Sequence, residues 1–129
     1  MAKKKPTVLI VEDTPSLRKL LTAELGQDKR VTVDEAGTGE EALKKAASPD
    51  CKVIVLDMML PDMDGLQFIE RLRVMRPDGP SVILMTGASE VAVPDSIIEA
   101  PYRGLVSAVF RKPFDHAKLR ETIAFCLAP

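Results

Sequence analysis

Five short runs of apolar, mostly β-branched residues recur along the chain and predict buried β-strands. These runs cover residues 7–11, 31–36, 53–56, 81–85 and 106–110. The run at 53–56 is apolar throughout, which is typical of a strand that is covered on both faces. Between the runs, apolar residues return every three or four positions and predict helices at 15–25, 39–47, 65–75 and 116–127. The chain therefore alternates strand and helix.

Residues at the expected helix starts support these boundaries. Thr14 and Asp115 precede two of the helices and predict N-caps, and Pro15 suits the first helical position. Thr38 and Glu41 have the spacing of a capping box, in which each side chain bonds the other's backbone N–H. We expect strand-to-helix connections with short loops.

The segment between the last two strands is interrupted by Pro94 and Pro101, so we expect at most a short helix near residues 95–100. Strands that alternate with helices pair in parallel, and a parallel sheet needs helices on both faces. The length of 129 residues suits one domain. The sequence thus predicts a single α/β domain over residues 1–129, in which residues 1–6 form a basic N-terminal tail.

Charge and composition exclude several classes of function. Lys and Arg number 18 against 19 Asp and Glu, and aromatic residues make up 4%, so we expect no direct binding of nucleic acid. The sequence has neither a signal peptide nor an apolar run of membrane-spanning length, so we expect no membrane association. Cys51 and Cys126 lie far apart and have no metal-ligand spacing, which favours reduced thiols and a cytoplasmic location.

Polar residues follow four of the five predicted strands. Glu12 and Asp13 follow the first, Asp57 the third, Thr86 the fourth and Lys112 the fifth. The carboxyl ends of parallel strands meet at one edge of a sheet, where ligands bind. Crowded carboxylates need a proton or a cation, and all-oxygen ligands favour Mg2+. A carboxylate at such a site can attack phosphorus, and a lysine and a hydroxyl can stabilise the transferred phosphoryl group.

Four stretches, IVEDTPSLRKLL, VIVLDMMLPDMDG, ILMTG and FRKPF, together resemble the receiver domains of two-component response regulators, a family that includes chemotaxis regulators. The resemblance covers essentially the whole chain. It implies a flavodoxin-like, doubly wound, five-stranded parallel sheet with strand order 2-1-3-4-5 and helices on both faces. It also implies a cis Lys112–Pro113 peptide bond.

The resemblance assigns a role to each residue at the strand ends. Asp57 is expected to accept the phosphoryl group, with Lys112 binding a phosphoryl oxygen and Thr86 serving as the switch hydroxyl. The Mg2+ site is expected to comprise the acids that follow the first strand, the phosphoacceptor and one backbone carbonyl: Glu12, Asp13, Asp57 and Met59.

The family's partners and its lack of turnover are implied in the same way. The phosphoryl donor is expected to be a phosphohistidine on a sensor histidine kinase or a histidine phosphotransfer protein. The output is expected to be a downstream protein or a dimer, contacted through residues 86–127, with no effector domain in the chain. Such a domain catalyses only its own phosphorylation and dephosphorylation and is not a turnover enzyme.

The chain departs from the family at one position of the switch, and two further positions bear on how fast the phosphoryl group is lost. Val109 stands where the family has a switch aromatic, and Phe110 is expected to face the other side of the sheet. This departure keeps open a second interpretation, a receiver-like interaction module that works without phosphorylation. Met59 and Ala88 cannot orient an attacking water, so we expect a long-lived phosphorylated state.

Two other classes fit the sequence poorly. A haloacid dehalogenase-like phosphohydrolase needs D-x-D after the first strand, where this chain has Glu12-Asp13-Thr14. A flavodoxin-like cofactor binder needs a loop rich in Ser, Thr and Gly, and EDTPS is acidic. Asp62 in a turn, Asp64 before a helix and the lone His116 are expected to be structural or solvated.

Overall fold

Strands and helices alternate in the computed structural model, which describes residues 5–87 and 106–128. The short helix expected near residues 95–100 and position 88 lie outside these ranges, as does most of the basic tail. The elements are β1 (Thr7–Val11), α1 (Pro15–Leu25), β2 (Thr32–Ala36), α2 (Gly39–Ala46), β3 (Cys51–Asp57), α3 (Gly65–Met75), β4 (Ser81–Thr86), β5 (Val106–Arg111) and α5 (His116–Leu127).

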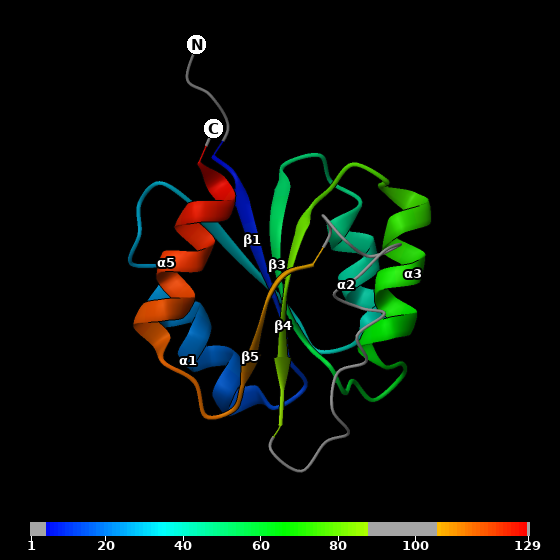
Figure 1. Cartoon of the computed structure of the whole chain (residues 1–129), viewed down its shortest axis with the longest axis horizontal. Helices are drawn as coiled ribbons and strands as arrows, with labels where there is room; N and C mark the ends of the chain where they lie inside the picture. The colour runs from blue at the N-terminus through cyan, green and yellow to red at the C-terminus, as the bar shows by residue number, and fades with distance from the viewer. Residues whose placement is uncertain (1–4, 88–105, 129) are drawn as a thin grey trace.

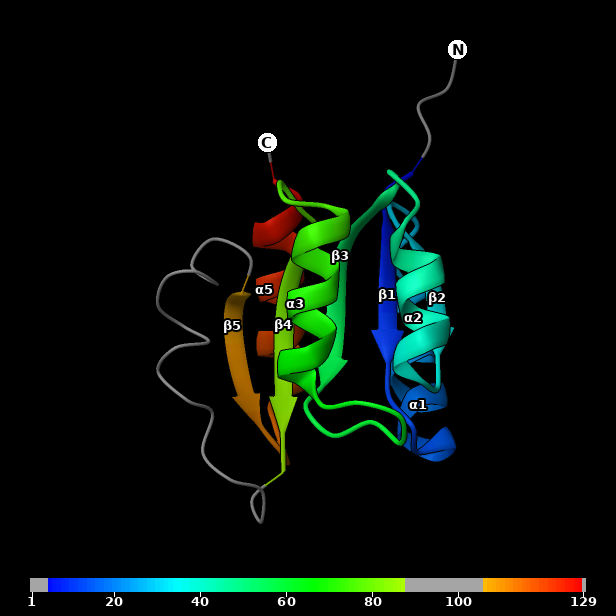
Figure 2. The ribbon, with the colours of Figure 1, turned by 90° about the vertical axis from the view of Figure 1, so that its right-hand side faces the viewer.

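The five strands form one parallel sheet in the order β2-β1-β3-β4-β5. Helices α1 and α5 cover one face, and α2 and α3 cover the other (Figures 1 and 2). This arrangement confirms the doubly wound fold expected from the sequence. All carboxyl ends of the strands lie at the same edge, so the residues that follow them are brought together from distant parts of the chain.

Each face of the sheet carries its own apolar cluster because the strands are buried on both sides. The cluster under α2 and α3 includes Leu9, Ile54 and Phe68, and that under α1 and α5 includes Ile10, Leu21 and Ile83. Neighbouring residues of β5 divide between the clusters: Val109 packs against the first and Phe110 against the second. Phe110 therefore cannot take the place of the missing switch aromatic on the Val109 side.

The helix starts follow the predicted caps with two exceptions. Thr14 occupies the N-cap of α1 without a side-chain hydrogen bond. The Thr38 hydroxyl accepts from the Glu41 N–H at 3.2 Å, but the Glu41 carboxylate accepts from Gly37 N–H at 2.9 Å. The predicted capping box is thus wrong in one half, because Glu41 reaches the residue before the N-cap.

Asp64 and Asp115 act as the predicted caps. The Asp64 carboxylate accepts from Gln67 N–H at 2.9 Å, and the Gln67 side chain accepts from Asp64 N–H at 3.0 Å, which completes a capping box at α3. Asp115 accepts from the N–H groups of Ala117 and Lys118 at the start of α5. Both aspartates therefore have structural roles, as the sequence indicated.

Arg76 anchors the end of α3 at the edge of the sheet where the strands begin. Its Nη1 donates to the carbonyls of Ala46, Ser48 and Cys51 at 3.0, 3.0 and 2.8 Å. The first two carbonyls belong to the end of α2 and the turn after it, where helical partners are lacking. One guanidinium therefore joins α3 to the connection between α2 and β3.

Candidate functional site

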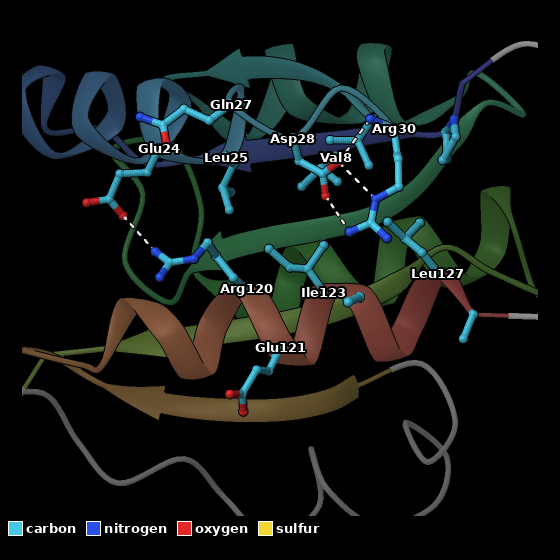
Figure 3. A pocket seen from close by; sticks show the side chains of 14 residues that line it. Val8, Glu24, Leu25, Gln27, Asp28, Arg30, Arg120, Glu121, Ile123 and Leu127 are labelled. Atoms are coloured by element: carbon cyan, nitrogen blue, oxygen red, sulfur yellow. Dashed lines mark hydrogen bonds and ion pairs between the residues drawn. The ribbon is translucent and has the colours of Figure 1, made fainter.

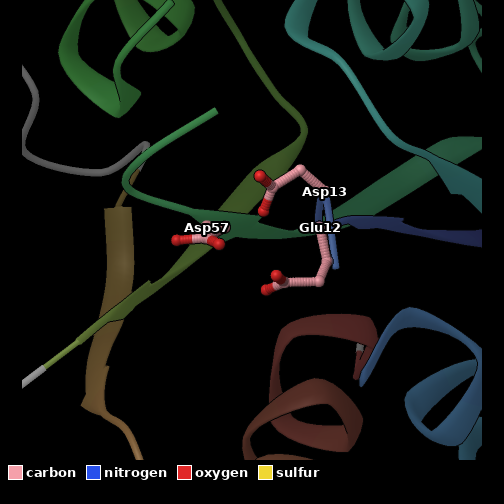
Figure 4. A group of neighbouring side chains, drawn as sticks. All are labelled: Glu12, Asp13 and Asp57. Carbon is pink, nitrogen blue, oxygen red and sulfur yellow. The ribbon is translucent and has the colours of Figure 1, made fainter. Parts of the chain in front are cut away.

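Three carboxylates meet at the carboxyl edge of the sheet, as the sequence predicted. Glu12 and Asp13 follow β1, Asp57 ends β3, and each offers an oxygen within 4.8 Å of the others' oxygens. Figure 4 shows the three carboxylates around a common space. Glu12 and Asp57 are 0% and 3% exposed, whereas Asp13 lies open to solvent. Two buried anions next to an accessible third form a site that needs a cation.

Lys112 supplies one cation to this cluster from the turn after β5. Its Nζ lies 3.0 Å from Glu12 Oε2 and 3.1 Å from Asp57 Oδ2. The Lys112–Pro113 peptide is cis, as the resemblance implied. The backbone N–H of Lys112 donates to the Thr86 carbonyl at 2.7 Å. The lysine is thus tied by its main chain to β4 while its ammonium bridges the acids of β1 and β3.

The charge state of the site follows from burial and from this bridge. Burial raises the pKa of the Glu12 carboxyl, the hydrogen bond from Lys112 acts against that rise, and the nearby Asp57 adds to it. Burial lowers the pKa of the Lys112 ammonium, but its bonds to Glu12 and Asp57 outweigh this, and the pKa is raised. Lys112 therefore stays protonated at neutral pH, and the acidic pocket retains affinity for further positive charge.

Arg18 is a supporting residue that the sequence reasoning missed. Its Nη1 donates to the Glu12 carbonyl at 2.9 Å, and its Nε donates to Glu35 at 2.9 Å. The N–H of Thr14 donates to Glu12 Oε1 at 3.2 Å. The backbone and the side chain of Glu12 are both fixed in this way. The pattern of apolar positions predicts a helix over residues 15–25, which contains Arg18, but carries no signal of the partners of this side chain.

Thr86 and Met59 complete the group of candidate residues. Thr86 is 3% exposed at the end of β4, next in the sheet to the end of β3. The N–H of Met59 donates to Asp57 Oδ1 at 3.2 Å, and the side chain of Met59 is exposed. Met59 also pairs with Asp64 in an isolated bridge. The structure therefore brings every predicted site residue to one edge, with Met59 in the loop beside Asp57.

A hollow in the described part of the chain is separate from this acidic edge. It has a volume of about 810 Å³ and lies between α1 and α5, beside the start of β1. Its floor is apolar, and the charged groups at its rim pair with one another, Asp28 with Arg30 and Glu24 with Arg120 (Figure 3). None of the site residues lines it. The hollow therefore lies apart from the residues of the predicted chemistry.

The model of the family described as "Response regulator receiver domain" matches residues 8–124. The chain belongs to this family. The sporulation initiation phosphotransferase F of Bacillus subtilis is 31% identical over 116 residues, which cover 90% of this chain and 89% of that protein. A protein-glutamate methylesterase/protein-glutamine glutaminase of Caulobacter vibrioides is 32% identical over 124 residues, 94% of this chain and 34% of that protein. The chain therefore spans only about a third of that methylesterase.

Solved structures agree with the family. The signal receiver domain of a putative Luxo repressor protein from Vibrio parahaemolyticus has a TM-score of 0.80 at 26% identity, covering 96% of this chain and 91% of that one. The receiver domain of an HD domain-containing protein from Pseudomonas fluorescens has a TM-score of 0.81 at 23% identity, covering 96% and 95%. The second shows a shared fold alone.

Membership of this family indicates a coarse function. Receiver domains of two-component systems generally accept a phosphoryl group, interact with histidine kinases or phosphotransfer proteins, and do not turn over substrate. Receiver domains typically use Mg2+, and the acidic cluster fits that ion. Within the described ranges, no helix is both long and apolar enough to cross a membrane.

Proposed function

We propose that this receiver domain accepts a phosphoryl group on Asp57, from a phosphohistidine of a sensor histidine kinase or a histidine phosphotransfer protein, in a Mg2+-dependent reaction. The observation that carries the proposal is the position of the Asp57 carboxylate. It shares a space with Glu12 and Asp13 and binds Lys112 at 3.1 Å, so an acidic nucleophile lies beside both a cation site and a cationic side chain.

The donor set suits Mg2+ because it consists of oxygens and leaves one side open. Asp13 and Asp57 would hold the ion, directly or through water, with Glu12 beside them and the Met59 carbonyl as a further ligand. When bound, Mg2+ neutralises the crowded carboxylates and the phosphoryl oxygens. Lys112 alone offers one positive charge against three carboxylates, so the metal-free site keeps an excess of negative charge.

The transfer itself needs one bond to form and one to break. An Asp57 carboxylate oxygen attacks the phosphorus, the P–N bond to the donor histidine breaks, and the imidazole, protonated on its other nitrogen, leaves as a neutral ring with the electron pair of that bond. Lys112 turns from Asp57 to a phosphoryl oxygen, and the Thr86 hydroxyl donates to another. The protein-interaction face at 86–127 then changes its contacts with a downstream protein or a second copy of the chain.

Mass spectrometry of the intact protein tests the proposal. Incubation with acetyl phosphate and Mg2+ is expected to add one phosphoryl group to the wild type and to Asp64→Asn, and none to Asp57→Asn. Excess EDTA is expected to prevent the addition. Asp64 lies in the same loop but caps α3, so Asp64→Asn controls for loop damage. Equal phosphorylation of Asp57→Asn, or addition that is indifferent to EDTA, would contradict the proposal.

Val109 favours one alternative, a receiver that binds its partner without phosphorylation. Its partly buried side chain packs against the cluster under α2 and α3 and has no ring whose rotation could follow the Thr86 hydroxyl. Partner affinity measured with and without beryllofluoride distinguishes the two. Affinity that depends on beryllofluoride supports the phosphorylation switch, and affinity unaffected by it supports the alternative.

A slow loss of the phosphoryl group is part of the same proposal. Met59 is two residues beyond Asp57, and its side chain has no polar group that could orient an attacking water. Met59→Asn is expected to hydrolyse the acyl phosphate faster than the wild type. Decay of the phosphorylated protein measures this, and a wild-type decay that is already fast and insensitive to the change contradicts it.

A further inference from the structure

The loop between β3 and α3 carries Met59 past the acidic cluster and is fixed at its base by the main chain. Met58 N–H donates to the Met85 carbonyl at 2.9 Å, and Gly65 N–H donates to the Met58 carbonyl at 2.6 Å. Within the loop, Leu60 N–H donates to the Met63 carbonyl at 3.1 Å. These bonds hold the two ends of the loop together but leave its tip to other contacts.

Asp62 at the tip binds the start of a different helix. Its Oδ1 accepts from Gly39 N–H at 2.8 Å, and its Oδ2 accepts from Glu40 N–H at 3.0 Å. These two N–H groups belong to the first turn of α2 and have no partner within the helix. The bond from Gly39 lowers the pKa of Asp62, with a further contribution from Glu40, so the carboxylate stays charged at neutral pH. Asp62 thus caps a helix 22 residues earlier in the chain.

Packing reinforces this contact next to Asp62. Met63 is buried, and a Cβ placed on Gly39 would lie 2.5 Å from its Cγ and Sδ. The loop therefore lies so close to α2 that only glycine fits at position 39 without a shift of Met63. Arg71 of α3 also pairs with Glu40 at 2.7 Å, which joins the two helices on the outside. The loop tip is therefore fixed on α2 by two neighbouring side chains, the carboxylate of Asp62 and the thioether of Met63.

We propose that Asp62 is a positioning residue that fixes the β3–α3 loop on α2 and so keeps the Met59 carbonyl aimed at the Mg2+ site. The proposal rests on the proposed role of Met59 as a metal ligand. Only two residues separate Met59 from Asp62, and the Leu60–Met63 hydrogen bond stiffens this part of the loop. Release of the loop tip from α2 would therefore loosen the Met59 carbonyl as a metal ligand. Asp62 itself touches neither metal nor phosphoryl group.

Binding of Mg2+, followed by NMR titration of the backbone amides, measures the effect directly. Asp62→Ala is expected to raise the Mg2+ dissociation constant by about three- to tenfold, below the larger effects of buried ligand-orienting groups because Asp62 is exposed. Phosphorylation at saturating Mg2+ is expected to proceed at the wild-type rate. Asp62→Asn, which keeps an acceptor for one N–H, is expected to fall between Asp62→Ala and the wild type.

Thr38→Ala is the matched control, because Thr38 caps the same turn of α2 through Glu41 N–H without touching the loop. Both variants are expected to lower the melting temperature, but Thr38→Ala should leave Mg2+ affinity within about twofold of the wild type. An unchanged dissociation constant in Asp62→Ala, or the same rise in Thr38→Ala, overturns the positioning role while the metal site stands. A wild type that binds no Mg2+ overturns the metal site and this inference together.

Discussion

Lys112 is the residue whose removal should change the stability of the metal-free protein most directly. It bridges Glu12 and Asp57 at 3.0 and 3.1 Å, with side-chain exposures of 25% for the lysine and 1% and 5% for the acids. Lys112→Met keeps the aliphatic stem and removes the charge. Two buried carboxylates then lose their shared cation, and the free energy of unfolding falls because water cannot reach them fully.

The magnitude follows from these contacts. A hydrogen bond to a charged group contributes about 1.5 to 3 kcal/mol, and breaking one partner of a buried ion pair costs about 3 to 5 kcal/mol. Partial exposure of the lysine reduces that figure, so we expect a loss of about 2 to 3 kcal/mol at neutral pH. Mg2+ should restore part of it, since the more negative site of the variant binds the ion more tightly.

Urea unfolding at neutral pH, with EDTA and then with saturating Mg2+, measures both quantities. Lys19→Met is the matched control: Lys19 Nζ lies 3.4 Å from Glu35 with its side chain 70% exposed, and its loss should cost under about 1 kcal/mol. If metal-free Lys112→Met is as stable as Lys19→Met, the lysine does not compensate the buried acids. A deficit that Mg2+ leaves unchanged would show that the ion and the lysine do not share the same carboxylates.

Three further results are expected. Burial raises the pKa of Glu12 above its ordinary 4.5, so the stability that the neutral acid contributes is present below pH 4.5 and is lost as the pH rises through the raised pKa. In calorimetry, metal-free Glu12→Gln should therefore melt at the same temperature as the wild type below pH 4.5 and at a higher temperature at neutral pH. Equal melting temperatures at both pH values would contradict this. Phe68→Ala should lose about 3 to 5 kcal/mol in urea unfolding because Phe68 is fully buried, whereas Val74→Ala, at 86% exposure, should stay within about 0.5 kcal/mol; similar losses would argue against the core assignment. Burial raises the pKa of the Cys51 thiol to about 11, so a thiol reagent at mildly alkaline pH should modify the half-buried Cys126 first. Rapid labelling of the Cys126→Ser variant, in which Cys51 is the remaining thiol, would contradict the burial of Cys51.

The parallel sheet and the meeting of the site residues at one edge were accessible from the sequence because both follow from short-range patterns, whereas the strand order and the residue roles were implied by the family resemblance. A strand buried on both faces shows as a continuous apolar run, and a parallel sheet delivers whatever follows each strand to one edge. This reasoning placed Asp57 beside Glu12 and Lys112, residues 45 and 55 positions away from it. The observed boundaries differ from the predicted ones by one or two residues, as at the strand starts Thr32 and Cys51. Residue propensities change gradually along the chain, whereas the hydrogen bonds that define a strand stop at one residue.

The contacts of charged side chains with distant backbone were not accessible in the same way. Asp62 was expected in a turn, and it does lie in one, but its carboxylate binds the start of α2. Arg18 was expected only as part of a helix, and it binds the Glu12 carbonyl. Neither contact leaves a periodic signal, since any residue can supply a backbone N–H or carbonyl. The Glu41 half of the capping box failed for a related reason, because Gly37 N–H competes with Thr38 N–H for one carboxylate.

The anchor at Arg76 has a consequence for how such proteins vary in evolution. Each of its three hydrogen bonds ends on a main-chain carbonyl, which every amino acid at positions 46, 48 and 51 provides. Substitutions at those positions leave the acceptors in place, so the anchor imposes no pairing between residue types. Covariation between positions among relatives would therefore not reveal this contact, whereas a mutational scan would show the loss of this contact for substitutions at position 76 and not for those at its three partner positions.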